Sequence, residues 1–180
     1  IKYFYMKNIL HSVKTQIRSL LKKPLYPFYW FIFAKSQNNN LENYLISEYA
    51  RKLNIDKSFI EFGFHLNQYN CISLTKSNYQ GLLIDGSIDN CNMANYIFCK
   101  LKLKTSAKSY WLKKSAIKPI INFLDSNSNK LGLLSIDIDG NDYWLLKEIY
   151  DLVKPDIIVT EYNASFGSRS ITVPYDDDFE

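Results

Sequence analysis

The stretch LGLLSIDIDG, Leu131–Gly140, decides the fold of this chain. It opens with a nearly continuous apolar run, which is typical of a parallel strand that is covered on both faces. The run ends in Asp137-Ile138-Asp139-Gly140, where alternating acids meet a glycine. A buried strand that ends in carboxylates predicts an α/β protein with its chemistry at the carboxyl edge of a parallel sheet.

Similar segments lie on both sides of this stretch. They are SFIEFGF (Ser58–Phe64), GLLIDG (Gly81–Gly86), the weaker YIFCKLKLK (Tyr96–Lys104) and PDIIVTEYN (Pro155–Asn163). Helices are expected between them, at about 65–78, 88–95, 109–124 and 142–153. Strands that alternate with helices predict a doubly wound, mainly parallel sheet, so we expect a Rossmann-like α/β fold.

A different pattern precedes the sheet. Residues 8–22 have apolar side chains at helical spacing with Lys and Arg between them, and the aromatic segment PLYPFYWFIFA (24–34) follows. SQNNN (36–40) is typical of a linker, and 41–53 is a further predicted helix. We therefore divide the chain into an N-terminal segment, 1–35, a linker and helix, 36–57, and a Rossmann-like domain, 58–180.

Composition excludes several classes of protein. The chain has 180 residues, of which 47% are hydrophobic, so it is long enough for one α/β domain and too apolar to be wholly disordered. No apolar run approaches the length of a membrane-spanning helix. The three cysteines form no CxxC pair, which argues against a zinc site or a disulfide framework and favours the reducing cytoplasm.

Charge is distributed unevenly along the chain. Residues 1–57 hold ten basic and three acidic side chains, whereas residues 125–180 hold four basic and twelve acidic ones. The basic amphipathic pattern and the aromatic segment within 8–34 suit peripheral contact with an anionic membrane surface, at its inner face. The same pattern also suits a helix that docks on its own domain. A nucleic-acid partner is not expected, because the basic stretch at 100–114 accompanies no groove-reading motif.

Two residues point to a nucleoside cofactor without phosphates. Gly63 ends the first strand but is not part of a G-x-G-x-x-G motif, so a pyrophosphate cradle is not expected. Asp85 ends the second strand, where an acid suits the hydroxyls of a ribose. Together they favour S-adenosylmethionine. The alternative is that Gly63 makes a tight turn and Asp85 caps a helix.

The sequence also resembles a family. EFG (61–63), GLLIDGS (81–87), LLSIDIDGNDYW (133–144), PDIIVTEYN (155–163) and ITVPYDDDF (171–179) occur in an order that resembles bacterial methyltransferase-like proteins related to the FkbM type, often found among surface-polysaccharide genes. The resemblance implies a class I S-adenosylmethionine-dependent methyltransferase that acts on a sugar or surface-glycan acceptor. The family's fold normally continues after the fifth strand with another helix and an antiparallel pair of strands. The resemblance therefore also implies that these last elements are missing from this chain.

The resemblance implies roles for individual residues. Glu61 and Gly63 would lie under the methionine part of the cofactor, and Asp85 would bind its ribose. A divalent ion such as Mg²⁺ would be held by Asp139, Glu161 and Asn163, because hard cations prefer oxygen ligands. The predicted catalytic set is Asp137, Asp139 and Asn141.

Competing interpretations of the same residues remain. Asn141 or Asp142 is a natural N-cap for the helix that follows, and Asp142 is best explained in that way. Tyr143 and Trp144 are expected in the core, and His65 is a second titratable candidate. The single-glycine loop and the missing strands also fit a non-catalytic remnant of the fold that serves as a scaffold or interaction module.

Overall fold

The structure is a computed structural model that describes residues 24–34, 40–121, 130–162, 165 and 167–177. The predicted helix at 8–22 and nearly all of the SQNNN linker lie outside these residues. In chain order the elements are α2 (Tyr26–Phe33), α3 (Asn40–Lys52), β1 (Ser58–Phe62), α4 (Ile72–Lys76), β2 (Gln80–Asp85), α5 (Ile88–Leu101), β3 (Thr105–Ser109), α6 (Lys114–Ile121), β4 (Leu131–Ile136), α7 (Asp142–Leu152) and β5 (Pro155–Thr160).

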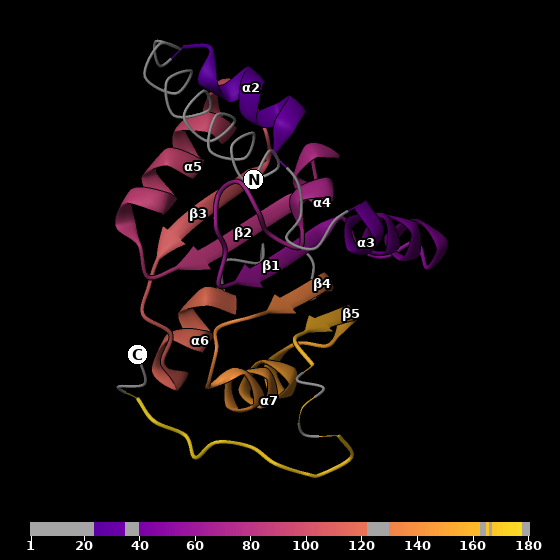
Figure 1. Ribbon diagram of the computed structural model, residues 1–180, viewed down its shortest axis with the longest axis vertical. Helices are drawn as coiled ribbons and strands as arrows, with labels where there is room; N and C mark the ends of the chain where they lie inside the picture. The colour runs from indigo at the N-terminus through magenta and orange to yellow at the C-terminus, as the bar shows by residue number, and fades with distance from the viewer. Residues whose placement is uncertain (1–23, 35–39, 122–129, 163–164, 166, 178–180) are drawn as a thin grey trace, which may run out of the picture.

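The strands form one sheet in the order β3-β2-β1-β4-β5, and every pair is parallel (Figure 1). The predicted Rossmann-like, doubly wound fold is confirmed. Strands β1 and β4 lie in the middle of the sheet and are buried along their whole length, which explains their continuous apolar runs. Because all strands run the same way, their carboxyl ends meet at one edge.

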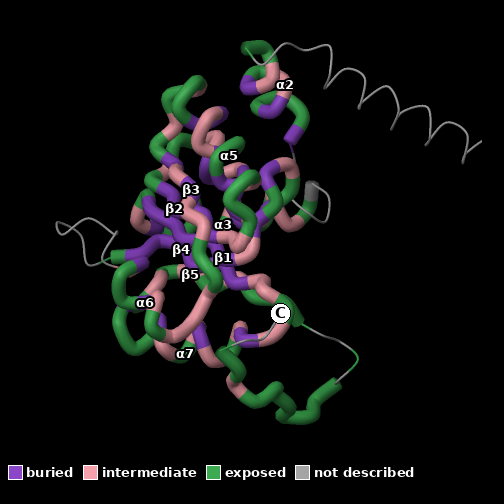
Figure 2. Tube along the Cα trace, turned by 90° about the vertical axis from the view of Figure 1, so that its left-hand side faces the viewer, coloured by how far each residue is buried: buried purple, intermediate pink, exposed green. Residues whose placement is uncertain are grey.

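Helices cover both faces of the sheet. On one face, Phe59, Leu83 and Leu133 pack into a core that also contains Trp30 of α2. Residues of α3, α4 and α5 contribute to the same core. On the other face, Leu134 packs with residues of α6 and α7. The buried residues accordingly follow the middle of the molecule in Figure 2. Helices α2 and α3 therefore share a hydrophobic core with the sheet.

The third strand was predicted in the wrong place. Residues 96–101 of the predicted strand belong to helix α5, and Lys102 ends that helix in the left-handed conformation. Strand β3 begins at Thr105 and has the polar sequence TSAKS. Its position is fixed by Asn95 of α5, whose amide group donates to the carbonyl of Ala107 and accepts its N–H, both at 2.8 Å. Because β3 is positioned by this tertiary contact, its own sequence needs no apolar pattern, and the strand could not be recognised from one.

The apolar run DIIVT (156–160) predicts a strand that is covered on both faces, and this prediction is wrong for β5. Its residues alternate between half-buried and exposed, and Ile158 is 39% exposed. Strand β5 is the edge of the sheet, and the described chain beyond it runs as an extended segment along α7 (Figure 1). No helix among the described residues is long and apolar enough to cross a membrane.

Candidate active site

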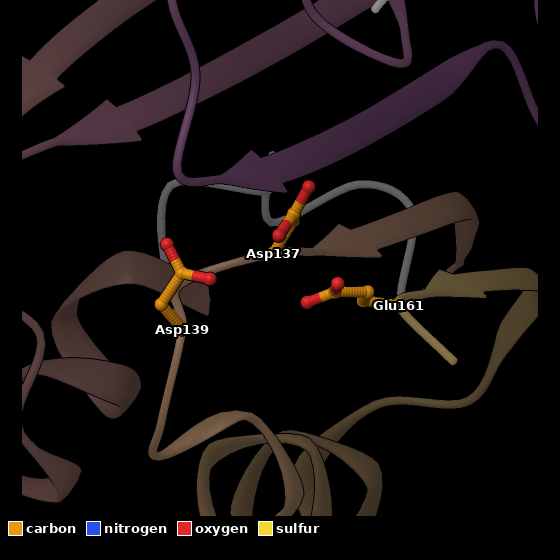
Figure 3. A group of neighbouring side chains, drawn as sticks. All are labelled: Asp137, Asp139 and Glu161. Carbon is orange, nitrogen blue, oxygen red and sulfur yellow. The ribbon is translucent and has the colours of Figure 1, made fainter. Parts of the chain in front are cut away.

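Three carboxylates meet where β4 and β5 end. Ile136 lies opposite Thr160 in the sheet, so Asp137 and Glu161 follow at neighbouring positions. One ligand oxygen of each, and one of Asp139, lie within 4.8 Å of one another. Figure 3 shows Glu161 pointing from the end of β5 toward the two aspartates. Sequence analysis predicted all three as site residues, and the structure brings them together.

The electrostatics of this acid cluster (Asp137, Asp139 and Glu161) are unfavourable without a partner. Asp139 and Glu161 are exposed, and Asp137 is half-buried. None of the three carboxylates has a hydrogen-bond donor among the residues that the structure describes. Burial of Asp137, followed by the negative charges of Glu161 and Asp139, raises the pKa of Asp137. A bound cation or a proton would relieve this repulsion.

The loop after β4 is shaped by Asp142. Its carboxylate accepts the N–H of Ile138 at 3.0 Å and the N–H of Gly140 at 2.9 Å. These bonds hold Asp139 between them, with a left-handed φ of 56° that aspartate tolerates better than most residues. The predicted N-cap role of Asp142 was wrong in detail, because helix α7 begins at this residue and its carboxylate bonds back to the loop.

Asn141 is buried and bonded to the backbone of Asp176. It is 5% exposed, and its amide group donates to the carbonyl of Asp176 at 2.6 Å and accepts the Asp176 N–H at 3.3 Å. The structure thus gives Asn141 a structural task, and its predicted catalytic role stays a prediction. Asn163, the third predicted metal ligand, lies outside the described residues.

The C-terminal segment 171–177 is held against α7 and the start of α6. Trp144 donates its indole N–H to the carbonyl of Val173 at 2.8 Å. The Tyr175 hydroxyl accepts the N–H of Lys114 at 3.0 Å, and the Lys114 ammonium lies 4.2 Å from the centre of the Tyr175 ring. Tyr143 is 52% exposed, so the prediction that it belongs to the core was wrong.

Glu61 lies at the same edge but is enclosed. It is 1% exposed, and its two carboxylate oxygens accept the N–H groups of Asn70 at 2.8 Å and Cys71 at 2.7 Å. Burial raises the pKa of Glu61 to about 7, and the two amides oppose that rise. The side chain therefore fixes the chain before α4, and direct cofactor contact by Glu61 stays a prediction.

Gly63 is required by close packing. It has a φ of 74°, and a Cβ built on it would lie 1.8 Å from the carbonyl oxygen of Asp137. Its N–H donates to the carbonyl of Ile84 at 2.9 Å. The end of β1 can thus approach the acid cluster only because this residue lacks a side chain. Such packing accounts for the glycine without a cofactor, so its predicted cofactor contact also stays a prediction.

The loop after Gly63 is ordered by side chains rather than by further glycines. Asn90 of α5 accepts the N–H of Leu66 at 3.1 Å and donates to the carbonyl of Phe64 at 2.7 Å. Trp30 of α2 donates its indole N–H to the Leu66 carbonyl at 2.7 Å. The helix predicted at 65–78 is therefore shortened to α4. His65 is exposed in this loop.

Asp85 ends β2 as predicted. It is half-buried, and its Oδ1 accepts the N–H of Ser87 at 2.8 Å. A Cβ built on Gly86 would lie 3.1 Å from the ring of Trp111, whose side chain is 70% exposed. Sequence analysis missed Trp111. The third strand was predicted at 96–104, so Trp111 was not expected to follow a strand end. Its exposed ring next to the Asp85 turn could stack on a flat ligand.

A cavity lies far from these residues, at the amino ends of the strands. Its volume is about 630 Å³, and its lining includes Lys57, Lys104 and Lys130 together with Asp56 and Asp156. None of the predicted site residues lines it. In parallel α/β sheets ligands bind at the carboxyl edge, so we place the candidate site at the acid cluster.

The parallel sheet with helices on both faces is a Rossmann-like α/β domain, and solved O-methyltransferase structures are similar to it in fold. The O-methyltransferase from Bacillus cereus, determined in complex with SAH, matches with a TM-score of 0.53 at 14% identity, over 80% of this chain and 69% of that chain. A structure from Klebsiella pneumoniae assigned as an O-methyltransferase matches with a TM-score of 0.57 at 13% identity, over 91% of this chain and 77% of that chain. No family model and no curated protein matches.

Proposed function

We propose that this protein is an S-adenosylmethionine-dependent O-methyltransferase whose acceptor is a sugar or surface-glycan hydroxyl. The observation that carries the proposal is the acid cluster at the carboxyl edge, where β4 and β5 end and where β4 lies next to β1. The similarity in fold to O-methyltransferases, one of them in complex with SAH, supports the choice of reaction. The glycan acceptor and the relationship to FkbM-type proteins rest on the sequence resemblance.

The cofactor would bind along the ends of β1 and β2. Asp85 would accept hydrogen bonds from the ribose hydroxyls, since it ends β2 and is only half-buried. Trp111 would stack on the adenine from the side of β3. Gly63 would let the cofactor pass close to the backbone. Glu61 would act indirectly, by fixing Asn70 and Cys71 just before α4.

The acid cluster fits a divalent cation. Opposite ligands of Ca²⁺ are about 4.8 Å apart and those of Mg²⁺ about 4.2 Å apart, given metal–oxygen distances of about 2.4 Å and about 2.1 Å. The three oxygens lie within 4.8 Å of one another, so their separations do not exceed that of opposite ligands of Ca²⁺. Asp139, Glu161 and Asn163 would hold the ion, and Asp137 beside them would stay unligated. A cation there would polarise an acceptor hydroxyl.

Asp137 would receive the proton of the acceptor hydroxyl. It is the half-buried member of the acid cluster, and its burial raises its pKa and so favours proton uptake. Asp142 would keep Asp139 in place by holding the loop. Much of the rate acceleration would come from alignment of the acceptor oxygen with the methyl group.

Titration calorimetry with S-adenosylhomocysteine, with and without Mg²⁺, tests this proposal. We expect micromolar binding that is lost in Asp85→Ala and kept in Asp89→Ala, which removes a nearby exposed acid in the first turn of α5. Absence of binding by the folded chain would contradict the proposal. That result would favour the second candidate, a non-catalytic scaffold. The side chains of Phe64, Leu66 and Tyr69, which fill the loop after Gly63, are the observation that favours it.

A further inference from the structure

Helix α2 presents an unusual apolar surface. All eight of its residues, YPFYWFIF, are apolar or aromatic, and those buried are Pro27 and Trp30. The outer side chains have exposed fractions between 40% and 68%: Leu25 56%, Phe28 61%, Phe31 40%, Ile32 68% and Phe33 57%. A helix that is apolar all round is expected inside a protein or in contact with lipid. An exposed patch of this kind therefore marks an interaction surface.

The helix is firmly attached to the domain by its inner side. The Trp30 ring packs edge-on against Phe98 of α5 with 5.5 Å between ring centres, and its indole N–H bonds to Leu66. Lys76 of α4 donates to the carbonyl of Ala34 at 2.7 Å, which caps the end of α2. These contacts fix the orientation of α2, so the outer patch is presented outward as a rigid surface.

In the sequence, the segments next to α2 and at the end of α5 carry charges of one sign. The first acid in the sequence is Glu42, and residues 1–41 contain seven Lys and Arg side chains. The end of α5 that packs against α2 continues into Lys100, Lys102 and Lys104, with no acid between Asp89 and Asp125 in the sequence. An apolar helix with basic neighbours matches a surface that is apolar inside and anionic outside.

We propose that α2 is a membrane-docking helix, which inserts Phe28, Ile32 and Phe33 into the interface of an anionic phospholipid bilayer. Basic residues that precede and follow it in the sequence would contact the lipid phosphates. A second copy of this chain fits less well, because pairing of two α2 helices would bring two basic segments together. The apolar side of α3 differs in this respect, since Glu42 and Glu48 lie among its exposed residues Leu41, Tyr44 and Tyr49.

Cosedimentation of the full chain with vesicles tests this proposal. We expect binding to phosphatidylcholine vesicles that contain about a quarter phosphatidylglycerol, and much weaker binding to phosphatidylcholine alone. Binding should fall several-fold between about 50 and about 500 mM NaCl. The triple variant Phe28→Ser, Ile32→Ser, Phe33→Ser should bind at least about tenfold more weakly, because three apolar side chains no longer leave water.

The matched control carries Leu41→Ser, Tyr44→Ser and Tyr49→Ser on α3, which removes as many exposed apolar side chains elsewhere. It should bind vesicles as the unchanged chain does, and thermal unfolding should show that both variants are folded. Equal loss in the two variants, or no vesicle binding by the unchanged chain, would overturn the proposal. A dimer in solution that the α2 substitutions dissociate, without vesicle binding, would overturn it in favour of a second copy.

Discussion

Glu61 and the acid cluster lie on neighbouring strands at the same edge of the sheet, yet their surroundings are opposite. Glu61 is enclosed and uses both oxygens to hold backbone amides. Asp137, Asp139 and Glu161 are at least partly open to solvent and repel one another. A buried carboxylate with all of its bonds made contributes to the fold, whereas grouped open carboxylates are available to a ligand. The difference separates a residue that supports the fold from residues that are open to a ligand.

The largest effect on the free energy of unfolding is expected at Gly63, where the end of β1 contacts the backbone of Asp137. Gly63→Ala would place a methyl group against the Asp137 carbonyl at a positive φ, so we expect the free energy of unfolding to fall by about 3 kcal/mol. Gly167→Ala is the control: its φ is also positive, at 57°, but nothing lies within 4 Å, so a loss of about 1 kcal/mol is expected. Urea unfolding measures both, and equal losses would show that the close approach is absent.

The next effect concerns the enclosed carboxylate. Glu61→Gln puts an NH₂ group where a backbone N–H needs an acceptor, which should lower the free energy of unfolding by about 2 kcal/mol at about pH 5. Because the pKa of Glu61 rises from 4.5 to about 7 on folding, its protonated form is favoured in the folded chain. Its stabilising contribution is complete below pH 4.5 and is lost as the pH rises through about 7.

The stability advantage of the unchanged chain over Glu61→Gln should therefore disappear between about pH 5 and about pH 8 and can reverse, because the linkage changes the difference by up to about 3 kcal/mol. Urea unfolding across this range provides the measurement. A difference that grows with pH would mean that the two amides outweigh burial and that the pKa of Glu61 is lowered instead.

A smaller effect on stability is expected at Asn141. The test asks whether this side chain has a structural role or the predicted catalytic one. Asn141→Ala removes both bonds to Asp176 and should cost about 1 kcal/mol. Hydrogen exchange at the amides of residues 175–177 should become faster. Tyr143→Ala in the same helix is the control, because this exposed side chain should leave that exchange unchanged. Unchanged exchange in Asn141→Ala would contradict the structural role of Asn141 and would favour its predicted catalytic role.

The smallest change in stability is expected within the acid cluster. Asp139→Asn relieves repulsion, so the free energy of unfolding should change by no more than about 0.5 kcal/mol, toward greater stability. Its binding of Mg²⁺ or Mn²⁺, measured by calorimetry, should weaken by about tenfold or more. Asp151→Asn on the exposed side of α7 should leave ion binding as it was. A clear loss of stability in Asp139→Asn would show that this side chain supports the fold, as Glu61 does.

Several features could be predicted from the sequence because they depend on local pattern. The apolar runs at 58–62, 80–85 and 131–136 identified the central strands, and their polar ends identified the edge at which Asp85, Asp137 and Glu161 lie. Strand β3 escaped this reasoning because TSAKS has no apolar pattern and is held by Asn95 from another element. Trp111 was missed for the same reason.

By itself, the sequence determined the α/β class, the carboxyl edge as the place of the site, and the candidate acids, since strand period and strand ends are properties of short segments. The tertiary structure alone decided which of those acids are enclosed and which are open. Glu61 and Asp137 look alike in the sequence, as acids in or next to apolar strands. One meets two backbone amides from the chain before α4, and the other meets two further carboxylates. Those neighbours come from distant segments, and only the folded chain brings them together.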